Sequence, residues 1–288
     1  MIERAGRWLF ASGDFQQARS ELEKAGSSLA QVVRLDQYYT SFDAVGPYHA
    51  ARKAAFAPRQ VAPSSSIVVP RLPREETIQV HVMAVLDEMP VHLTAGLSRP
   101  DASGYTPCLR AGDLVFMAGQ LARDASDKLA ARGVGAETTF MLRNRIAPTL
   151  EAAGSGLELV LKAQAYVSDA ARLPEFWAAW KEAFPGGVPP TLAVPLPHPA
   201  FLTREATVEI NIVAAHAGAR ARVKSVDCRA CSRVFDGLLF LEGLGSEAEA
   251  QAALDAAGAR PVRMLKFGPE IGIAPGSHPV VDVWGHVQ

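Results

Sequence analysis

The sequence lacks long apolar runs, an excess of charge of either sign, and a set of cysteines that could all pair. No stretch approaches the roughly 20 consecutive apolar residues that a membrane-spanning helix needs. The opening MIERAGRWLF also lacks the profile of a signal peptide. We therefore expect a cytoplasmic protein with no membrane partner.

Net charge is close to zero, because 29 lysines and arginines face 30 aspartates and glutamates. Without a net positive field the protein has little to attract nucleic acid over a distance, and no local basic patch takes its place. We expect a small-molecule substrate and no nucleic-acid partner.

Cysteine is scarce, with Cys108, Cys228 and Cys231 the only examples. Three cysteines cannot all pair within one chain, which argues against a disulfide-stapled secreted fold. Cys228 and Cys231 form a CxxC pair, but no second pair and no suitably spaced histidines accompany it. We expect no metal and no cofactor, and the role of the pair stays open.

What the sequence does contain is a repeat. Apolar residues make up 49% of the 288 residues, enough for two or three units with their own cores. Three segments share one pattern, a turn that opens a buried strand ending at glycine: RAGRWLFASG (4–13), RAGDLVFMAG (110–119) and the weaker DGLLFLEG (236–243). An amphipathic helix that ends before glycine is predicted after each, at 15–25, 141–153 and 247–257.

The first two copies continue in parallel. Each has a second strand (31–40 and 159–168), a second helix (45–56 and 173–184) and two closing strands (66–69 with 77–86, and 191–194 with 206–214). The third copy runs from a strand at 262–267 almost directly to one at 280–287, so it is an abbreviated unit. Residues 121 to about 143 have no counterpart in the other copies and predict a lid or surface loop. The predicted units are residues 1–90, 91–218 and 219–288.

The chain resembles the Rid/YjgF family, small trimeric proteins that include 2-iminobutanoate deaminases and are often called endoribonuclease L-PSP. In copy two the resemblance is carried by RAGDLVFMAGQ (110–120), EAAGSGLELVLKAQAYVSD (151–169) and ATVEINIVA (206–214). Copy one supplies RAGRWLFASGD, EKAGSSLAQVVRLDQYYTSF and VVPRLPREETIQVHVMAVL. The resemblance implies an α+β, chorismate mutase-like fold. Its tandem units would form a pseudo-trimeric barrel with helices outside, in one chain or across a homo-oligomer.

The resemblance also implies an active site in a cleft between neighbouring units. The family glutamate of the closing strand corresponds to Glu209, with Gln79 in copy one and Asp282 in copy three. The family tyrosine corresponds to Tyr105, and the serine at the end of the first strand is kept as Ser12. The predicted catalytic residues are Glu209, as general acid and base, and Tyr105, which would orient water or substrate.

The arginine that holds the substrate carboxylate in the family is replaced here by Ser64 and Leu192. A guanidinium grips a carboxylate through a planar fork of donors, which neither replacement offers. Other residues must then bind the substrate, and the candidates are Arg71, Arg204, Arg263, His198, Ser12 and Gln79. The three arginines and His198, like Glu209, can also be explained as ordinary exposed side chains of a strand or loop.

Two classes of function fit these residues. The first is an enzyme of a specialised metabolic pathway that hydrolyses or deaminates an imine, enamine or enol-ether carboxylate, with a chorismatase-like hydrolase as a variant. The second is a non-catalytic ligand-binding or scaffolding homologue that kept the cleft and lost the arginine. An arginine that converges on Glu209 would favour the enzyme, and a closed apolar cleft would favour the second class.

Overall fold

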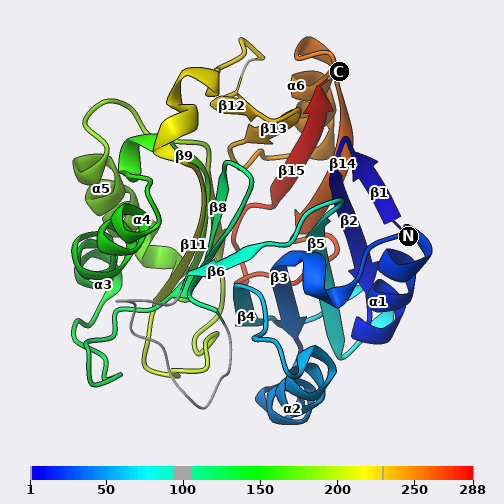
Figure 1. The fold of residues 1–288 in the computed structure, drawn as a ribbon. Coiled ribbons are helices and arrows are strands. Elements are labelled where there is room, and N and C mark those ends of the chain that lie inside the picture. The colour runs from blue at the N-terminus through cyan, green and yellow to red at the C-terminus, as the bar shows by residue number, and fades with distance from the viewer. Residues whose placement is uncertain (1, 94–105, 229, 288) are drawn as a thin grey trace.

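Three sheets of similar design follow one another along the chain (Figure 1). The computed structural model describes residues 2–93, 106–228 and 230–287. Within these ranges strand pairing gives three separate sheets and does not join them into one closed barrel. In Figure 1 the helices lie on the outer sides of the sheets, and the sheets approach one another in the middle of the molecule.

Unit 1 is a five-stranded sheet with the order β1-β2-β5-β3-β4, in which only the β3–β4 pair is parallel. Its elements are β1 (Ile2–Ala5), β2 (Trp8–Gly13), α1 (Phe15–Lys24), β3 (Val32–Tyr39), α2 (Val45–Phe56), β4 (Ser64–Val68) and β5 (Ile78–Val85). Helix α1 begins where the Asp14 carboxylate accepts the Gln17 N–H, and it buries Ala18 and Leu22. The predicted helices of this unit are confirmed, α2 to the residue.

Unit 2 repeats this order and adds one edge strand, giving β10-β9-β11-β8-β7-β6. Its elements are β6 (Val91–Leu93), β7 (Cys108–Ala111), β8 (Leu114–Gln120), α3 (Val134–Met141), α4 (Ala147–Ala152), β9 (Val160–Val167), α5 (Leu173–Ala183), β10 (Thr191–Pro195) and β11 (Val208–Ala215). The predicted start of the first helix at residue 141 is wrong, because helical structure begins at Val134 and continues through a π-helical segment, Leu142–Ile146. The unmatched segment is therefore a loop only over residues 121–133.

The Glu137 carboxylate explains the early start of α3. It accepts hydrogen bonds from the Gly133 N–H at 3.1 Å and from the Thr207 and Val208 N–H groups at 2.8 and 3.2 Å. The first turn of α3 is thereby tied to the start of β11. Gly135 and two threonines lower the local helix propensity, so this tertiary anchor could not be read from the sequence.

Unit 3 is the abbreviated copy, as predicted. Its elements are β12 (Ser232–Phe235), β13 (Leu238–Leu241), α6 (Glu247–Ala256), β14 (Ala259–Phe267) and β15 (Val280–Val287). The four strands pair in the order β12-β13-β15-β14. Among the described residues, the parallel edge strand that β4 and β10 supply in the other units has no counterpart, so β14 pairs with β15 and otherwise makes only an isolated parallel bridge from Phe267 to Ile271.

Equivalent residues of the three sheets meet at the centre of the molecule. The Tyr38 and Tyr166 hydroxyls are 2.8 Å apart, and the Phe267 ring centroid lies 5.8 and 6.2 Å from the two tyrosine rings. Next to these rings the strands place one buried cation each, Arg34 on β3, Lys162 on β9 and Arg263 on β14. The centre of the molecule is therefore charged as well as aromatic.

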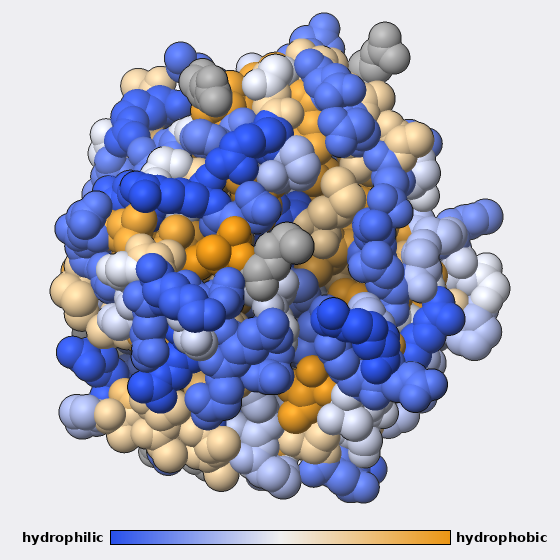
Figure 2. Space-filling view, turned by 90° about the vertical axis from the view of Figure 1, so that its right-hand side faces the viewer, coloured by the Kyte–Doolittle hydropathy of each residue, from blue (hydrophilic) through white to orange (hydrophobic). Residues whose placement is uncertain are grey.

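The face seen in Figure 2 is mostly hydrophilic, with apolar side chains in small separate patches. None of the described helices is long and apolar enough to cross a membrane.

Candidate active site

Glu209 lies on β11, where unit 2 meets β4 of unit 1, and is only 6% exposed. Burial raises the pKa of its carboxyl to about 8, although hydrogen bonds from the Ser66 N–H and the Ser65 hydroxyl and the nearby charge of Arg123 act in the opposite direction. Asn211 Nδ2 donates to Ser65 Oγ at 2.7 Å, which leaves the serine hydroxyl proton for Glu209. The site thus holds a carboxyl group that is largely protonated at neutral pH.

Gly119 of β8 makes room for this carboxyl. A Cβ atom at position 119 would lie 2.1 Å from Glu209 Oε1 and 3.0 Å from Ser65 Oγ. Any other residue at this position would have to displace the Glu209 side chain. The closing glycine of the repeated strand therefore has a direct role at the site.

Replacing Gly119 with alanine should displace Glu209 and cost about 1–3 kcal/mol of folding free energy, as overpacking of a buried site does. Chemical denaturation of the purified variant measures this cost. Gly46→Ala is the matched control, because a Cβ at position 46 would meet open space. In a Glu209→Ala background the clash disappears and the cost of Gly119→Ala should shrink; an equal cost in both backgrounds would refute the proposed contact.

We call this contact between β11 of unit 2 and β4 of unit 1 the Glu209 seam. Helix α2 of unit 1 also contributes side chains to it. His49 Nε2 lies 3.1 Å from Ser66 Oγ, and burial lowers the pKa of His49 to about 3, so its imidazole is neutral. Arg52 is buried and donates to Gln37 Oε1 at 2.6 Å and to Ser64 Oγ at 3.4 Å. A guanidinium from the helix thus reaches the strand position where the family resemblance places an arginine.

Arg123 brings a second guanidinium to the neighbourhood of Glu209. Its Nη1 pairs with Asp127 at 2.8 Å, and its Nη2 donates to Thr203 Oγ1. It lines an open, polar cavity of about 330 Å³ together with Gln120, Asn144 and Arg145. Sequence reasoning missed Arg123 because the segment that carries it was interpreted as a lid. Its only sequence signal is its place just after β8.

The register of the strands corrects two equivalences from the sequence. Tyr38 pairs with Gln79 and Tyr166 with Glu209, while Phe267 pairs with Val280. Unit 3 therefore has valine at the position of Glu209, whereas Asp282 corresponds to His81 and Asn211. The second correction concerns the residue that matches Ser64. Leu35 pairs with Ser64 in unit 1, and the equivalent residue of unit 2, Ala163, pairs with Thr191. Thr191 therefore matches Ser64, and Leu192 does not.

The predicted substrate-binding residues do not gather around Glu209. Arg71 Nη2 donates to the Gly268 and Pro269 carbonyl oxygens, and the guanidinium of Arg204 lies 4.5 Å from the centre of the Phe42 ring. His198 Nδ1 is 3.1 Å from Ser168 Oγ. Tyr105 lies outside the described residues.

The remaining predicted residues belong to unit 1 and unit 3. Gln79 lies on β5, and its Oε1 is buried with no hydrogen-bond partner among the described residues. Ser12 and Arg263 line one common cavity, described below. Cys228 and Cys231 are free thiols, and within the described ranges no three His, Cys, Asp or Glu side chains are placed so that they could hold a metal ion.

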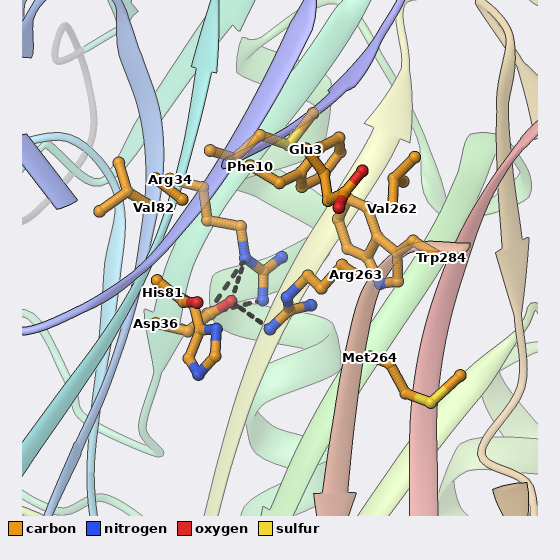
Figure 3. A pocket seen from close by; sticks show the side chains of 13 residues that line it. Glu3, Phe10, Arg34, Asp36, His81, Val82, Val262, Arg263, Met264 and Trp284 are labelled. Atoms are coloured by element: carbon orange, nitrogen blue, oxygen red, sulfur yellow. Dashed lines mark hydrogen bonds and ion pairs between the residues drawn. The ribbon is translucent and has the colours of Figure 1, made fainter. Parts of the chain in front are cut away.

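That second cavity measures about 180 Å³ and lies between the sheets of units 1 and 3 (Figure 3). Asp36 accepts hydrogen bonds there from Arg34 Nε at 3.0 Å and from Arg263 Nη2 at 2.7 Å. Both guanidinium groups lie over the Trp284 ring, 5.7 and 5.2 Å from its centroid. His81 lines the same cavity, and burial lowers its pKa to about 3.

The family model described as endoribonuclease L-PSP matches residues 97–216. This segment, which includes Gly119 and Glu209, belongs to the Rid/YjgF family, as the sequence resemblance predicts. No curated protein matches the chain.

Several solved structures of this family are similar to part of the chain. Yeast Mmf1 shares 18% identity over 44% of this chain and 99% of its own, with a TM-score of 0.40. RidA from the Antarctic bacterium Psychrobacter sp. shares 22% identity over 43% of this chain and 98% of its own, with a TM-score of 0.39. A YjgF/YER057c/UK114 family member from Mycobacterium tuberculosis shares 28% identity over 44% of this chain and 98% of its own, with a TM-score of 0.37.

Proposed function

We propose that this protein is a small-molecule enzyme of Rid/YjgF descent that hydrolyses or deaminates an imine, enamine or enol-ether carboxylate at the Glu209 seam. The observation that carries the proposal is the buried Glu209 carboxyl, whose pKa is raised to about 8 by its surroundings. A general acid and base works best when its pKa lies near the working pH. Perturbed carboxyls of this kind are frequent at catalytic sites.

The chemistry needs one carboxyl group in two protonation states. In the acid form Glu209 donates its proton to the imine nitrogen, which makes the carbon more electrophilic. The resulting carboxylate accepts a proton from the water that adds to this carbon. Transfer of that proton to nitrogen and collapse of the carbinolamine release ammonia and the carbonyl product, and the carboxyl group regains its proton.

The substrate carboxylate requires a cation, and Arg123 is the candidate that the geometry favours. Its charge acts on Glu209, and it lines an open cavity. Ser65 and Ser66 of unit 1 face Glu209 from the other side of the seam, so the site needs two units. We extend the proposal to the assembly: the three units of this chain stand in for the three subunits of a family trimer.

The test compares wild type with Glu209→Gln on 2-imino acids that an amino acid oxidase generates in situ, with ketone formation as the readout. Wild type should accelerate hydrolysis, with kcat/KM falling above about pH 8 as the acid form is lost. Glu209→Gln should reduce the rate by at least two orders of magnitude, about the contribution of a general acid. Glu205→Gln makes the same change on an exposed residue nearby and should keep full activity.

Equal rates for Glu209→Gln and wild type would remove Glu209 from the mechanism. If wild type accelerates none of the imines, enamines or enol ethers, the second class of function is favoured, a ligand-binding homologue without catalysis. One observation points in that direction: Arg71, Arg204 and Arg263 contact other groups and none is placed against Glu209.

A further inference from the structure

The cavity between units 1 and 3 exists where unit 3 lacks a strand. In units 1 and 2 the strands β3 and β9 are each covered by a parallel edge strand, whereas β14 is left with one open edge. Three consecutive residues of β14, Val262, Arg263 and Met264, line the cavity. The missing strand would have lain beside β14, where these residues now border the cavity. The other wall is the sheet of unit 1.

Hydrogen-bond donors point at this space without acceptors. Among the described residues, the hydrogen bonds of Arg34 use Nε and Nη2, and those of Arg263 use Nη1 and Nη2, so Arg34 Nη1 and Arg263 Nε make no hydrogen bond there. Trp284 is fully buried, and its Nε1 also has no partner. Three N–H groups in one small cavity, two of them on cations, call for an acceptor with negative charge.

The balance of buried charges next to the cavity also favours an anionic ligand. Arg34, Lys162 and Arg263 are balanced by two carboxylates, Asp36 and Asp282, at 2.7–2.9 Å. His81 adds no negative charge. Burial lowers the pKa of Lys162, while the neighbouring Asp282 acts in the opposite direction. When Lys162 is ionised, one buried positive charge is left over, and a buried charge without a counter-ion is costly. Glu3 is a partly exposed residue of the same cavity, and its carboxylate pairs with Arg260 at 3.4 Å.

Apart from Ser12, the rest of the lining is apolar. Phe10, Met83, Val262 and Met264 all line the cavity. Figure 3 shows Phe10 and Val262 above the guanidinium groups and Met264 below them. A cavity of about 180 Å³ is slightly larger than one of about 150 Å³ that holds benzene. The occupant that fits is therefore a molecule of about six to nine heavy atoms with one anionic end and an apolar body.

We propose that this cavity is a second ligand site, separate from the Glu209 seam, which binds a small monocarboxylate. The carboxylate accepts hydrogen bonds from Arg34, Arg263 and the Trp284 indole, and its apolar part packs against Phe10 and Val262. The site rests on no catalytic step at Glu209. It follows from the missing strand of unit 3.

Calorimetric titration with butyrate and benzoate tests the site, with butyramide and benzamide as uncharged controls of the same shape. The carboxylates should bind and the amides should bind at least tenfold more weakly. Trp284→Phe removes the indole N–H and keeps a smaller aromatic ring, so it should weaken benzoate binding about tenfold, the value of one hydrogen bond to a charged group. Trp177→Phe, on the half-exposed face of α5, is the matched control and should bind normally.

Location separates this site from the proposed active site. Glu209→Gln should bind benzoate like wild type, and a crystal soaked in 3-bromopropionate should show anomalous bromine density beside Val262. The proposal fails if carboxylates and amides bind alike, if Trp284→Phe binds like wild type while its circular dichroism is unchanged, or if the bromine lies at the Glu209 seam. Imine hydrolysis at Glu209 can succeed or fail independently of each result.

Discussion

Replacing Asp282 with alanine should lower the free energy of unfolding by about 3–5 kcal/mol, the usual cost of breaking a buried ion pair from one side. Asp282 is fully buried and lies 2.7 Å from Lys162 Nζ and 2.9 Å from Arg263 Nη1. Gln164 Nε2 also donates to it at 2.6 Å. Without this carboxylate, one aspartate would remain for the three central cations.

Urea denaturation of Asp282→Ala and Asp282→Asn measures the loss. Asparagine keeps the shape and removes the charge, so its cost should be close to that of alanine if charge dominates. Asp227→Ala, at an exposed position, should change stability by less than about 0.5 kcal/mol. A loss below 1 kcal/mol for Asp282→Ala would show that the central charges do not hold the units together.

The same cluster predicts sensitivity to acid. Burial alone would raise the pKa of Asp282, but Lys162 and Arg263 outweigh burial and hold the pKa below its usual value. The pKa of Asp36 is lowered for the same reason, by Arg34 and Arg263. A carboxyl whose pKa is lower in the folded state stabilises the fold above its unfolded pKa of about 3.9, and this contribution is lost as pH falls through the folded value.

Local structure could be predicted well where the periodicity of apolar residues agreed with the glycines and turn residues that end helices and strands. Helix α2 and strand β15 have the predicted bounds, and α1 and α6 differ by one residue at their ends. The start of α3 was missed because its anchor, Glu137, bonds to residues about seventy positions away. Such a contact leaves no local pattern.

The candidate site was predictable only in part. Position along the closing strand pointed to Glu209, but Ser65 approaches it from another unit, and that approach depends on how the sheets meet. The equivalence of Asp282 with Glu209 was wrong by two residues, because short alternating strands align almost equally well after such a shift. Arg34 and Lys162 received no role, although each interrupts a strand that is otherwise mostly apolar, which is a usable sign of a buried charge.

A buried Glu209 that keeps its proton at neutral pH makes the free energy of unfolding depend on pH. The pKa of Glu209 is about 8 in the folded protein against an ordinary value of 4.5. Because the folded value is raised, the contribution of Glu209 to the free energy of unfolding is fully present below pH 4.5 and is lost as pH rises to about 8. The slope is about 1.4 kcal/mol per pH unit, so the total loss is on the order of 5 kcal/mol.

Glu209→Gln removes this titration and should therefore be more stable than wild type by several kcal/mol at pH 8.5, with a much smaller difference at pH 4.5. Burial lowers the pKa of His49 and of His81 from 6.5 to about 3, so these histidines also make stability depend on pH between those values. Both proteins contain them, so their effect cancels in the difference between wild type and the variant. Urea denaturation of both proteins at several pH values gives the difference directly. A constant difference across this range would mean that the Glu209 carboxyl is ionised in the fold, and then it could not act as the acid in imine hydrolysis. A difference that grows with pH would show that the protein gives up stability at neutral pH to keep this proton in place.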